Sequence, residues 1–278
     1  MHDYELLQKY LEGMRDFTGA DLQAINLRGA NLVNIILTGA NLAGARLPSA
    51  YLASATLCRA DLTASELTRA FLHRADLTAA RVSQGNLNGA DLTKANLRGA
   101  FLVRASLQSA KLGGANLSGA NLREANLENI NFCGATLTGI NLRASNLRGA
   151  NLSWANLSGA RLSGANLDNV LLTDVNLHAA YLNGVNLCGV DLTGVNLSEA
   201  KLNGVNLSHA NLTGANLSGA ILRRATLVNT KLVGADLSGA DLSGAECQEM
   251  DLHRAIYTDE TRFPTGFDPI RSGAWLAF

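Results

Sequence analysis

Residues 116–120 read Asn-Leu-Ser-Gly-Ala, and this five-residue phrase repeats in one register along most of the chain. The leucine site recurs every five residues from Leu22 to Leu252, and the residue two places before it is usually alanine. Asn or Asp mostly stands between the two, and a polar residue and then often Gly follow the leucine. One register over so long a stretch indicates one elongated repeat unit rather than two globular domains.

A period of five residues fits neither an α-helix nor a β-strand. A helix would distribute the leucines over all its sides, and a strand would alternate them between its two faces. The leucines and alanines can be buried together only if the chain turns through the same angle every five residues. Gly119 falls at the third position of a four-residue turn, where a type II turn requires a positive φ. Each pentapeptide is therefore predicted to be a short extended segment and a corner, and right-angled corners place four of them in a coil.

Charged residues support a coil of four pentapeptides, because residues 20 apart in the sequence would then stack directly. Opposite charges at this separation are Arg46/Glu66, Asp61/Arg81, Asp91/Lys111, Arg104/Glu124, Glu128/Arg148, Arg148/Asp168 and Lys231/Asp251, whereas like charges are only Arg74/Lys94 and Arg123/Arg143. A three-sided coil gives as many like pairs as opposite pairs. Since like charges directly opposite destabilise neighbouring strands, four sides are favoured.

The interior is predicted to hold ladders of leucine with alanine between them, as Leu117 and Ala120 illustrate. Burial of each leucine would contribute roughly 1.5–3 kcal/mol before the entropy cost is subtracted. Phe132 is the oversized residue of this core, and Val82 with Gly85 forms its undersized pentapeptide. Both are interpreted as local packing adjustments, and a bend of the rod at residues 82–85 is the alternative.

The two ends of the chain, residues 1–16 and 258–278, lie outside the repeat, which is assigned to residues 17–257. We expect both ends to act as caps, since the exposed core and unpaired edges of a solenoid favour aggregation. The first segment is predicted to be helical, with an apolar face made of Leu6, Leu7, Tyr10, Leu11 and Met14. The second is predicted to be irregular, with Pro264, Pro269 and the bulk of Phe263, Phe267, Trp275 and Phe278. The alternatives are a partner-binding helix at the first end and a docking surface for a second copy at the other.

The composition excludes several classes of protein. Lys+Arg and Asp+Glu balance at 23 each, so no overall field favours nucleic acid or an anionic membrane. The four cysteines are irregularly spaced, which fits a reducing compartment better than a disulfide framework. The sequence holds no long apolar run, and its polar, acidic beginning does not resemble a secretory signal. A cytoplasmic protein is expected, and removal of an earlier targeting segment is left open.

The four-sided arrangement brings no catalytic or metal-binding group together. Cys58, Cys133 and Cys188 would lie in different columns and several coils apart, beyond disulfide reach. The carboxylates near the end of the repeat would point out of four different faces, as an acidic collar: Asp236, Asp241, Glu246 and Asp251. The sequence therefore predicts neither an enzyme nor a cofactor or metal site.

Apolar residues at the outward Asn/Asp site are the more informative signal. Tyr51 and Phe71 are 20 residues apart and are expected to stack on one face. Such a stack is either a contact patch for a partner or a stabiliser between coils, and the sequence leaves both open. Apolar residues also occupy this site at Ile36, Leu171 and Ile221. The candidate partner contacts are Tyr51, Phe71, Phe101 and Tyr181.

The phrases at 60–63 (Ala-Asp-Leu-Thr), 95–99 (Ala-Asn-Leu-Arg-Gly) and 185–189 (Val-Asn-Leu-Cys-Gly) resemble the pentapeptide repeat family. The resemblance covers about residues 20–257, and residues 10–17 and 263–269 resemble cyanobacterial members. It implies an all-β fold, a right-handed quadrilateral parallel β-helix of about 12 coils and roughly 55 Å in length at the usual strand spacing.

The resemblance implies one function, and the residues themselves favour another. Some members of the family mimic duplex DNA and bind a type II topoisomerase, but this chain departs from them because its net charge is zero and its outward column is mainly Asn. The favoured interpretation is a non-enzymatic rigid scaffold that binds an unknown protein partner through a flat face or an end. It would be a monomer or an end-to-end dimer, with neither a membrane nor nucleic acid as its partner.

Overall fold

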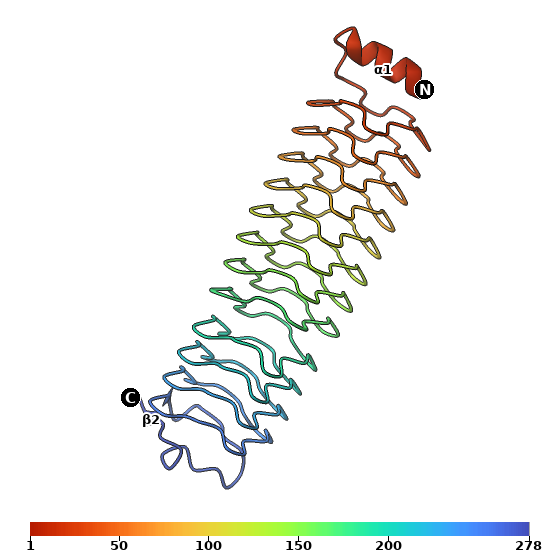
Figure 1. Cartoon of the computed structure of the whole chain (residues 1–278). Helices are drawn as coiled ribbons and strands as arrows, with labels where there is room; N and C mark the ends of the chain where they lie inside the picture. The colour runs from red at the N-terminus through yellow and green to blue at the C-terminus, as the bar shows by residue number, and fades with distance from the viewer. Residues whose placement is uncertain (278) are drawn as a thin grey trace.

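The computed structural model describes residues 1–277 as a slender rod of stacked coils (Figure 1). The helix α1 (Asp3–Leu11) lies at one end of the rod, and the short strands β1 (Ile256–Tyr257) and β2 (Trp275–Leu276) lie at the other. Between them the chain consists of turns joined by single bridging residues. No helix among these residues is both long enough and apolar enough to cross a membrane.

The bridges show how the coils are stacked. From the bridge between Asp16 and Ile36 onward, most outward residues pair in parallel with the residue 20 positions later, so that four pentapeptides complete one coil. This is the separation that the charge pairs predict. Each side of a coil contributes only one bridging residue, because the corner occupies most of the pentapeptide. The extended segments are thus shorter than β-strands, although they form the same parallel ladder.

The corner of each pentapeptide has a left-handed residue where the sequence places glycine. Gly119 has a φ of 67°, and the next amide, that of Ala120, donates to the carbonyl oxygen of Leu117 at 3.0 Å. Residues with side chains adopt the same conformation at other corners, for example Arg59 at 57° and Trp154 at 59°. The left-handed region costs such residues roughly 1 kcal/mol each, so the closed ladder and the filled core hold them in it.

The core is continuous along the rod, and Leu117, Ala120, Phe132 and Val82 are all fully buried within it. Near Val82 the ladder is unbroken, since its amide donates to the carbonyl oxygen of Phe101 at 2.7 Å. A Cβ added to Gly85 would approach the carbonyl oxygen of Val82 to 2.9 Å, so this position needs glycine. The structure therefore shows a local packing adjustment here, and the alternative of a bend at residues 82–85 is wrong.

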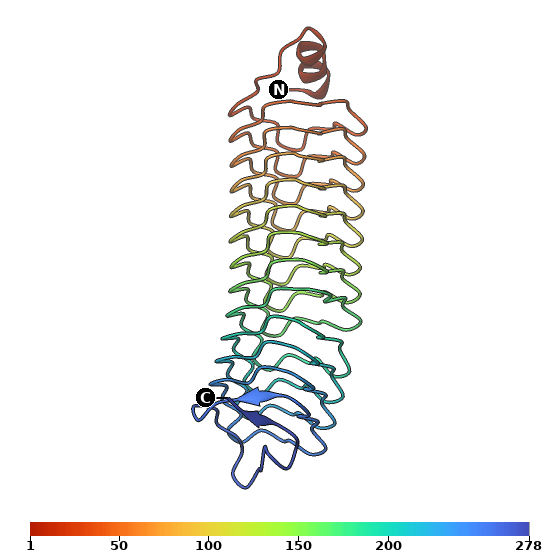
Figure 2. The same ribbon diagram turned by 90° about the vertical axis from the view of Figure 1, so that its left-hand side faces the viewer.

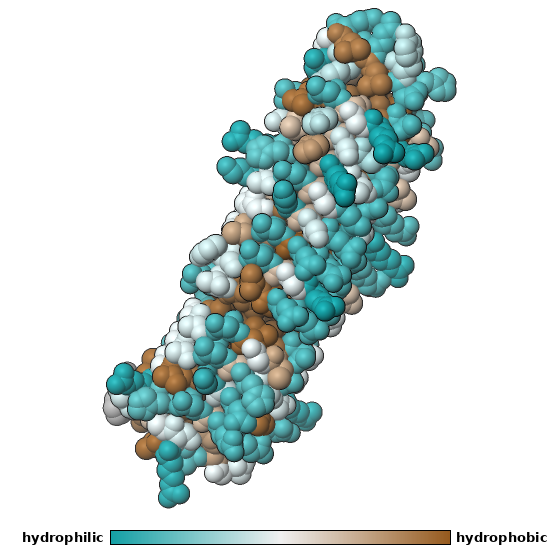
Figure 3. Space-filling model, in the orientation of Figure 1, coloured by the Kyte–Doolittle hydropathy of each residue, from teal (hydrophilic) through white to brown (hydrophobic). Residues whose placement is uncertain are grey.

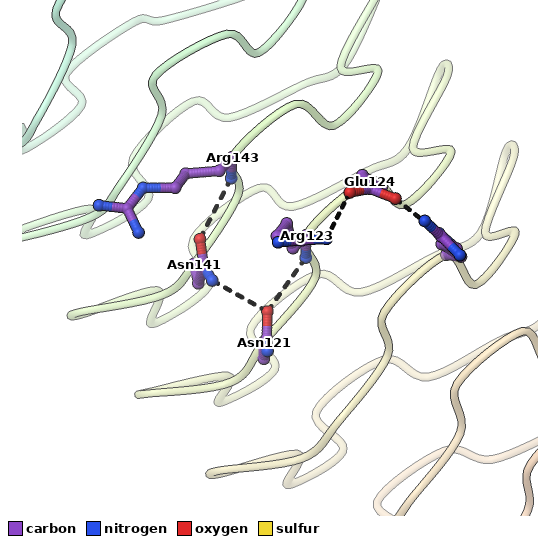
Figure 4. A network of polar contacts seen from close by, with 6 residues as sticks. Asn121, Arg123, Glu124, Asn141 and Arg143 are labelled. Carbon is purple, nitrogen blue, oxygen red and sulfur yellow. Dashed lines mark hydrogen bonds and ion pairs between the residues drawn. The ribbon is translucent and has the colours of Figure 1, made fainter.

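Asparagine is common at the outward site because its amide has two partners. The side-chain oxygen of Asn121 accepts from the backbone amide of Arg123 at 3.2 Å and from the side-chain amide of Asn141 on the next coil at 3.0 Å (Figure 4). The first bond stabilises the turn and the second joins the coils. Glu124 forms ion pairs at 2.6 Å with Arg123 and with Arg104, the latter being one of the predicted pairs.

Both ends of the rod carry apolar contacts with the coils. In α1, Leu6 is fully buried, and the hydroxyl of Tyr10 donates to the carbonyl oxygen of Val33 at 2.8 Å. Leu11 and Met14 are exposed, so the apolar face of this helix is narrower than predicted.

At the other end the repeat register stops, but pairing continues, because β2 lies parallel to β1. Phe263 packs there against Tyr257 and Phe267. Phe278 lies outside the described residues. That these two ends act as caps stays a prediction.

The stack of coils opens at one level. We call this region the coil opening and define it as residues 164–175 together with the facing residues 183–196 of the next coil. The bridges expected between Asn166 and Asn186 and between Leu171 and Asp191 are missing among the described residues. The amides that lack their usual carbonyl partner there are those of Gly164, Leu167, Asn169, Leu172, Asp174, Asn186, Asp191 and Asn196. Figure 1 shows the corresponding gap between the green and the blue-green coils.

The opening is a wedge rather than a complete break. On the neighbouring sides the ladder is kept, as in the bridges from Arg161 to Tyr181 and from Asn176 to Asn196. The turns also stay closed, since the amide of Val170 still donates to the carbonyl oxygen of Leu167 at 3.2 Å. The rod curves below this level in Figure 2, so the pentapeptides remain intact while two sides of one coil separate from the next.

Candidate interaction surfaces

The aromatic pair predicted at the outward site is present on one flat side of the rod. The rings of Tyr51 and Phe71 stack with centroids 4.8 Å apart and planes 8° from parallel. Their backbones are bridged, and the residues before and after them in the column are Asn31 and Asp91. Tyr51 is 47% exposed and Phe71 41% exposed, so the outer surface of both rings faces solvent.

Phe101 and Tyr181 do not join this pair. They stand in a different column, where Phe101 is bridged to Arg81 and Asn121, and Tyr181 to Arg161 and Lys201. Both are exposed and they lie several coils apart. The four candidate contacts thus form one stacked pair, Tyr51–Phe71, and two isolated aromatic residues. Phe101 and Tyr181 each lie beside an arginine.

Two recesses accompany the coil opening, one on each of its two open sides. One has a volume of about 330 Å³ and is polar, with Arg148, Asp168 and Cys188 in its lining. The other, of about 320 Å³, is lined by apolar, hydroxyl and carboxylate groups. The lining of this second recess includes Leu171, Leu172, Asp174, Asp191 and Thr193. Figure 3 shows hydrophobic surface gathered about this level of the rod.

Trp154 contacts Asp174, which lines the second recess, and it was missed by the sequence reasoning. It occupies the left-handed corner position, is 61% exposed, and donates from its indole Nε1 to Oδ2 of Asp174 at 3.1 Å. The sequence reasoning considered apolar residues only at the Asn/Asp site, whereas Trp154 stands at the turn position. A tryptophan where glycine is usual was the available signal.

The coil opening lies where valine stands above valine in two adjacent columns. Val170 stacks under Val190, and Val175 under Val195, at sites where most coils have alanine. A β-branched side chain is bulkier than alanine, and overpacking forces the backbone to shift. A third stack, of Val185 under Val205, keeps its ladder, although the bond from the amide of Asn206 to the carbonyl oxygen of Val185 is 3.1 Å long. The opening thus coincides with two adjacent valine stacks, whereas the coils stay bonded at the single stack.

The four carboxylates of the predicted acidic collar do not form a cluster. Asp236, Glu246 and Asp251 stand in three different columns, and Asp241 forms an ion pair with Arg223 at 2.7 Å. Burial alone would raise the pKa of Asp241, but hydrogen bonds from Ser243 and the Arg223 guanidinium lower it to about 2.

The cysteines are free thiols. Burial, together with the neighbouring Asp76, raises the pKa of the Cys58 thiol to about 11, and burial raises that of Cys247 to about 11. No group of three or more potential metal ligands lies together in residues 1–277.

A sequence model described as "Pentapeptide repeats (8 copies)" matches the chain in overlapping segments that run from residue 16 to residue 256. The chain belongs to the pentapeptide-repeat family. Proteins of this family form right-handed quadrilateral β-helices, and the four-sided ladder of this member agrees with that architecture. No curated protein matched the chain.

Several solved structures are similar to this chain, and two of them are cyanobacterial pentapeptide-repeat proteins. HetL from Nostoc sp. strain PCC 7120, described as involved in heterocyst differentiation regulation, is 32% identical over 94% of this chain and 99% of its own, with a TM-score of 0.52. The Nostoc protein alr5209 is 39% identical over 37% of this chain and 84% of its own, with a TM-score of 0.36. QnrB1, a plasmid-mediated fluoroquinolone resistance protein, is 17% identical over 74% of this chain and 88% of its own, with a TM-score of 0.42.

Proposed function

We propose that this pentapeptide-repeat protein is a non-enzymatic scaffold that binds a protein partner through one flat side of the rod. The observation that supports this is the stacked, solvent-facing pair Tyr51–Phe71. Aromatic side chains contribute much of the binding energy in protein interfaces, and they lose little conformational entropy when they are already held in place. The continuous ladder beneath these two residues holds them in that way.

The same pair has a second interpretation, in which it stabilises the stack of coils. An aromatic pair contributes roughly 0.5–1.5 kcal/mol beyond its buried area. The two roles differ in what is lost on substitution, since a stabiliser changes the unfolding transition, whereas a contact patch changes binding. An experiment on this pair must therefore measure both.

The test is a quantitative affinity capture from the lysate of the source cells, with the wild type and the variant Tyr51→Ser/Phe71→Ser as baits. We expect specific partners to be lost with the variant and kept with Phe101→Ser, which removes an equally exposed ring from another column. The melting temperature of each bait is measured in parallel. Equal recovery of every partner by the folded double variant would contradict the proposal.

The alternative, binding of a type II topoisomerase by mimicry of DNA, has less support on this surface. Acidic and basic residues are balanced over the chain, and arginine or lysine stands at outward sites such as Arg81, Lys111 and Arg161. A uniformly anionic face is what mimicry of a phosphate backbone needs. A change in gyrase supercoiling on addition of the protein would restore this alternative.

The ends of the rod offer a second way to associate. Trp275 and Leu276 in β2 are exposed, as are Tyr4 and Leu11 in α1. We propose a monomer that can pair end to end through these groups, in a reducing compartment such as the cytoplasm, where the free cysteines would persist. Light scattering over a range of concentrations distinguishes the monomer from the dimer, and truncation after residue 257 shows whether the C-terminal segment is needed for folding.

A further inference from the structure

The coil opening leaves two facing rows of backbone groups without their usual partners. On its Leu171 side, the amides of Leu172 and Asp174 lack the carbonyl oxygens of Asp191 and Thr193 that the 20-residue ladder would supply. Unpaired edges of this kind readily pair with another extended chain. An extended segment has donors and acceptors on both of its edges, so it can pair with both coils.

The side chains around the recess specify what such a segment would carry. Its lining includes the carboxylates of Asp174 and Asp191 and no lysine or arginine. Oδ2 of Asp174 accepts from the indole of Trp154, and Oδ1 of Asp191 accepts from the hydroxyl of Thr193 at 2.6 Å. Each carboxylate keeps a second oxygen available for a basic group.

The apolar surface around the recess is continuous with it. Leu171 lines the recess and is exposed, and the exposed Trp154 of the preceding coil contacts Asp174 at its rim. Leu172 and Val170 are less completely buried than their counterparts on intact coils. An apolar side chain of a partner would cover this surface and shield the core. The polar recess on the other side of the opening has Arg148 and Asp168 together, so charge complementarity singles out the Leu171 side.

We propose that the coil opening is a docking site for an extended peptide segment that carries a lysine or arginine beside an apolar residue. Its backbone pairs with Leu172 and Asp174 on one coil and with Asp191 and Thr193 on the next. Its apolar side chain packs on Trp154 and Leu171, and its basic side chain meets the two carboxylates. This site is a second interaction surface of the scaffold and is independent of the Tyr51–Phe71 pair.

The test uses fluorescein-labelled peptides of alternating valine and lysine, with valine–glutamate peptides of equal length as the control, and measures fluorescence anisotropy at low salt with the full chain. We expect the lysine peptide to bind the wild type, and the glutamate peptide to bind at least about tenfold more weakly, since charge-assisted hydrogen bonds would be lost. The variant Asp174→Asn/Asp191→Asn should bind the lysine peptide more weakly than the wild type does, by a similar factor. Asp91→Asn, in the same column as Asp191 on an intact part of the ladder, should leave the affinity unchanged.

Two further variants separate backbone pairing from simple charge attraction. Val190→Ala/Val195→Ala keeps both carboxylates but replaces the valine stacks by the usual alanine, so it should close the ladder and abolish binding. Tyr51→Ser/Phe71→Ser should bind the lysine peptide as the wild type does, whether or not the proposed function of that pair is correct. The inference is overturned if the lysine peptide fails to bind the wild type or if Asp91→Asn weakens its binding as much as Asp174→Asn/Asp191→Asn does. It is also overturned if the variant with alanine at 190 and 195 binds the peptide normally although its Leu172 amide has become protected from hydrogen exchange.

Discussion

The coils around Leu117 and the coil opening are built from the same pentapeptides but differ in how they stack. Around Leu117 the bonds between coils are formed, as from the amide of Leu117 to the carbonyl oxygen of Thr136 on the next coil at 2.8 Å. At the opening the turns are still closed, for example from Val170 to Leu167 at 3.2 Å, while the bonds to the next coil are missing on two sides. The comparison teaches that the corner and the stack are separate requirements. The Leu-Xaa-Gly corner depends on the sequence within one pentapeptide, whereas stacking depends on residues 20 apart.

Substitution of leucine gives the largest expected difference between the two regions. Leu117→Ala should lower the free energy of unfolding by about 2–5 kcal/mol, because it leaves a cavity in a close-packed core. Leu172→Ala should cost distinctly less, since Leu172 is 5% exposed and borders a recess. Urea unfolding of the two variants measures the difference. Equal losses would mean that the core at the opening is packed as tightly as elsewhere.

Thiol reactivity compares the two regions without mutation of the core. Cys58 lies within an intact part of the ladder, and Cys188 is exposed at the polar recess of the opening. The pKa of the Cys58 thiol is raised from 9.0 to about 11. At pH 8 this thiol is therefore ionised about a hundredfold less than a thiol with the ordinary pKa. Alkylation by iodoacetamide should therefore modify Cys188 well before Cys58.

Mass spectrometry of the alkylated peptides assigns the sites. Cys188→Ser is the control, since it should remove the fast reaction of that thiol and leave the slow one of Cys58. If Cys58 were modified as fast as Cys188, its burial beside Asp76 could not be as tight as the structure shows.

Valine introduced into the intact region should reproduce the opening there. The variant Ala90→Val/Ala95→Val/Ala110→Val/Ala115→Val places two valine stacks in the columns that hold Val170/Val190 and Val175/Val195. Overpacking of a close-packed core usually costs about 1–3 kcal/mol, and we expect the variant to lose that much or more. Hydrogen exchange of the Leu92 and Leu97 amides, which bond to Lys111 and Asn116 at 2.8 and 2.7 Å, should become faster.

The control for this variant contains valine without stacking. Ala90→Val/Ala115→Val adds two of the same side chains in different columns, so neither lies directly under the other. The amides of Leu92 and Leu97 should stay protected from hydrogen exchange in this control, because even the stack of Val185 under Val205 keeps the bonds between its coils. Fast exchange in the control as well would show that valine itself, and not the stacking of valines, separates the coils.

The period of five and the spacing of charges were sufficient to predict four-sided coils, the buried leucines and the stacked Tyr51 and Phe71. These features depend on the average pentapeptide, which is repeated often enough to be recognised. Trp154 and the coil opening depend on deviations from it, and a valine is harmless in one coil and disruptive only above another valine. The stacks of Val170/Val190 and Val175/Val195 are visible in the sequence once the 20-residue spacing is known, but their effect on the backbone is a balance of packing and hydrogen bonding that only coordinates show.

The reverse substitution has the smallest expected effect on stability and tests the cause of the opening most directly. Val190→Ala/Val195→Ala removes apolar atoms, at about 0.8 kcal/mol for each buried CH₂, but it allows the bonds between the coils to form, at roughly 1 kcal/mol each. Because these contributions oppose each other, the free energy of unfolding should change by no more than about 2 kcal/mol. Hydrogen exchange should change far more, since the amides of Leu167, Asn169 and Leu172 would gain partners.

Nuclear magnetic resonance can follow these three amides alongside that of Leu117, which serves as an internal reference because its bond to Thr136 lies far from the substituted residues. Slower exchange at the three amides, with no change at Leu117, would show that the valine stacks hold the coils apart. If the three amides still exchanged rapidly in the alanine variant, the opening would have to arise from another feature of residues 164–196, and Leu171 and Trp154, which are exposed there, would be the next residues to replace.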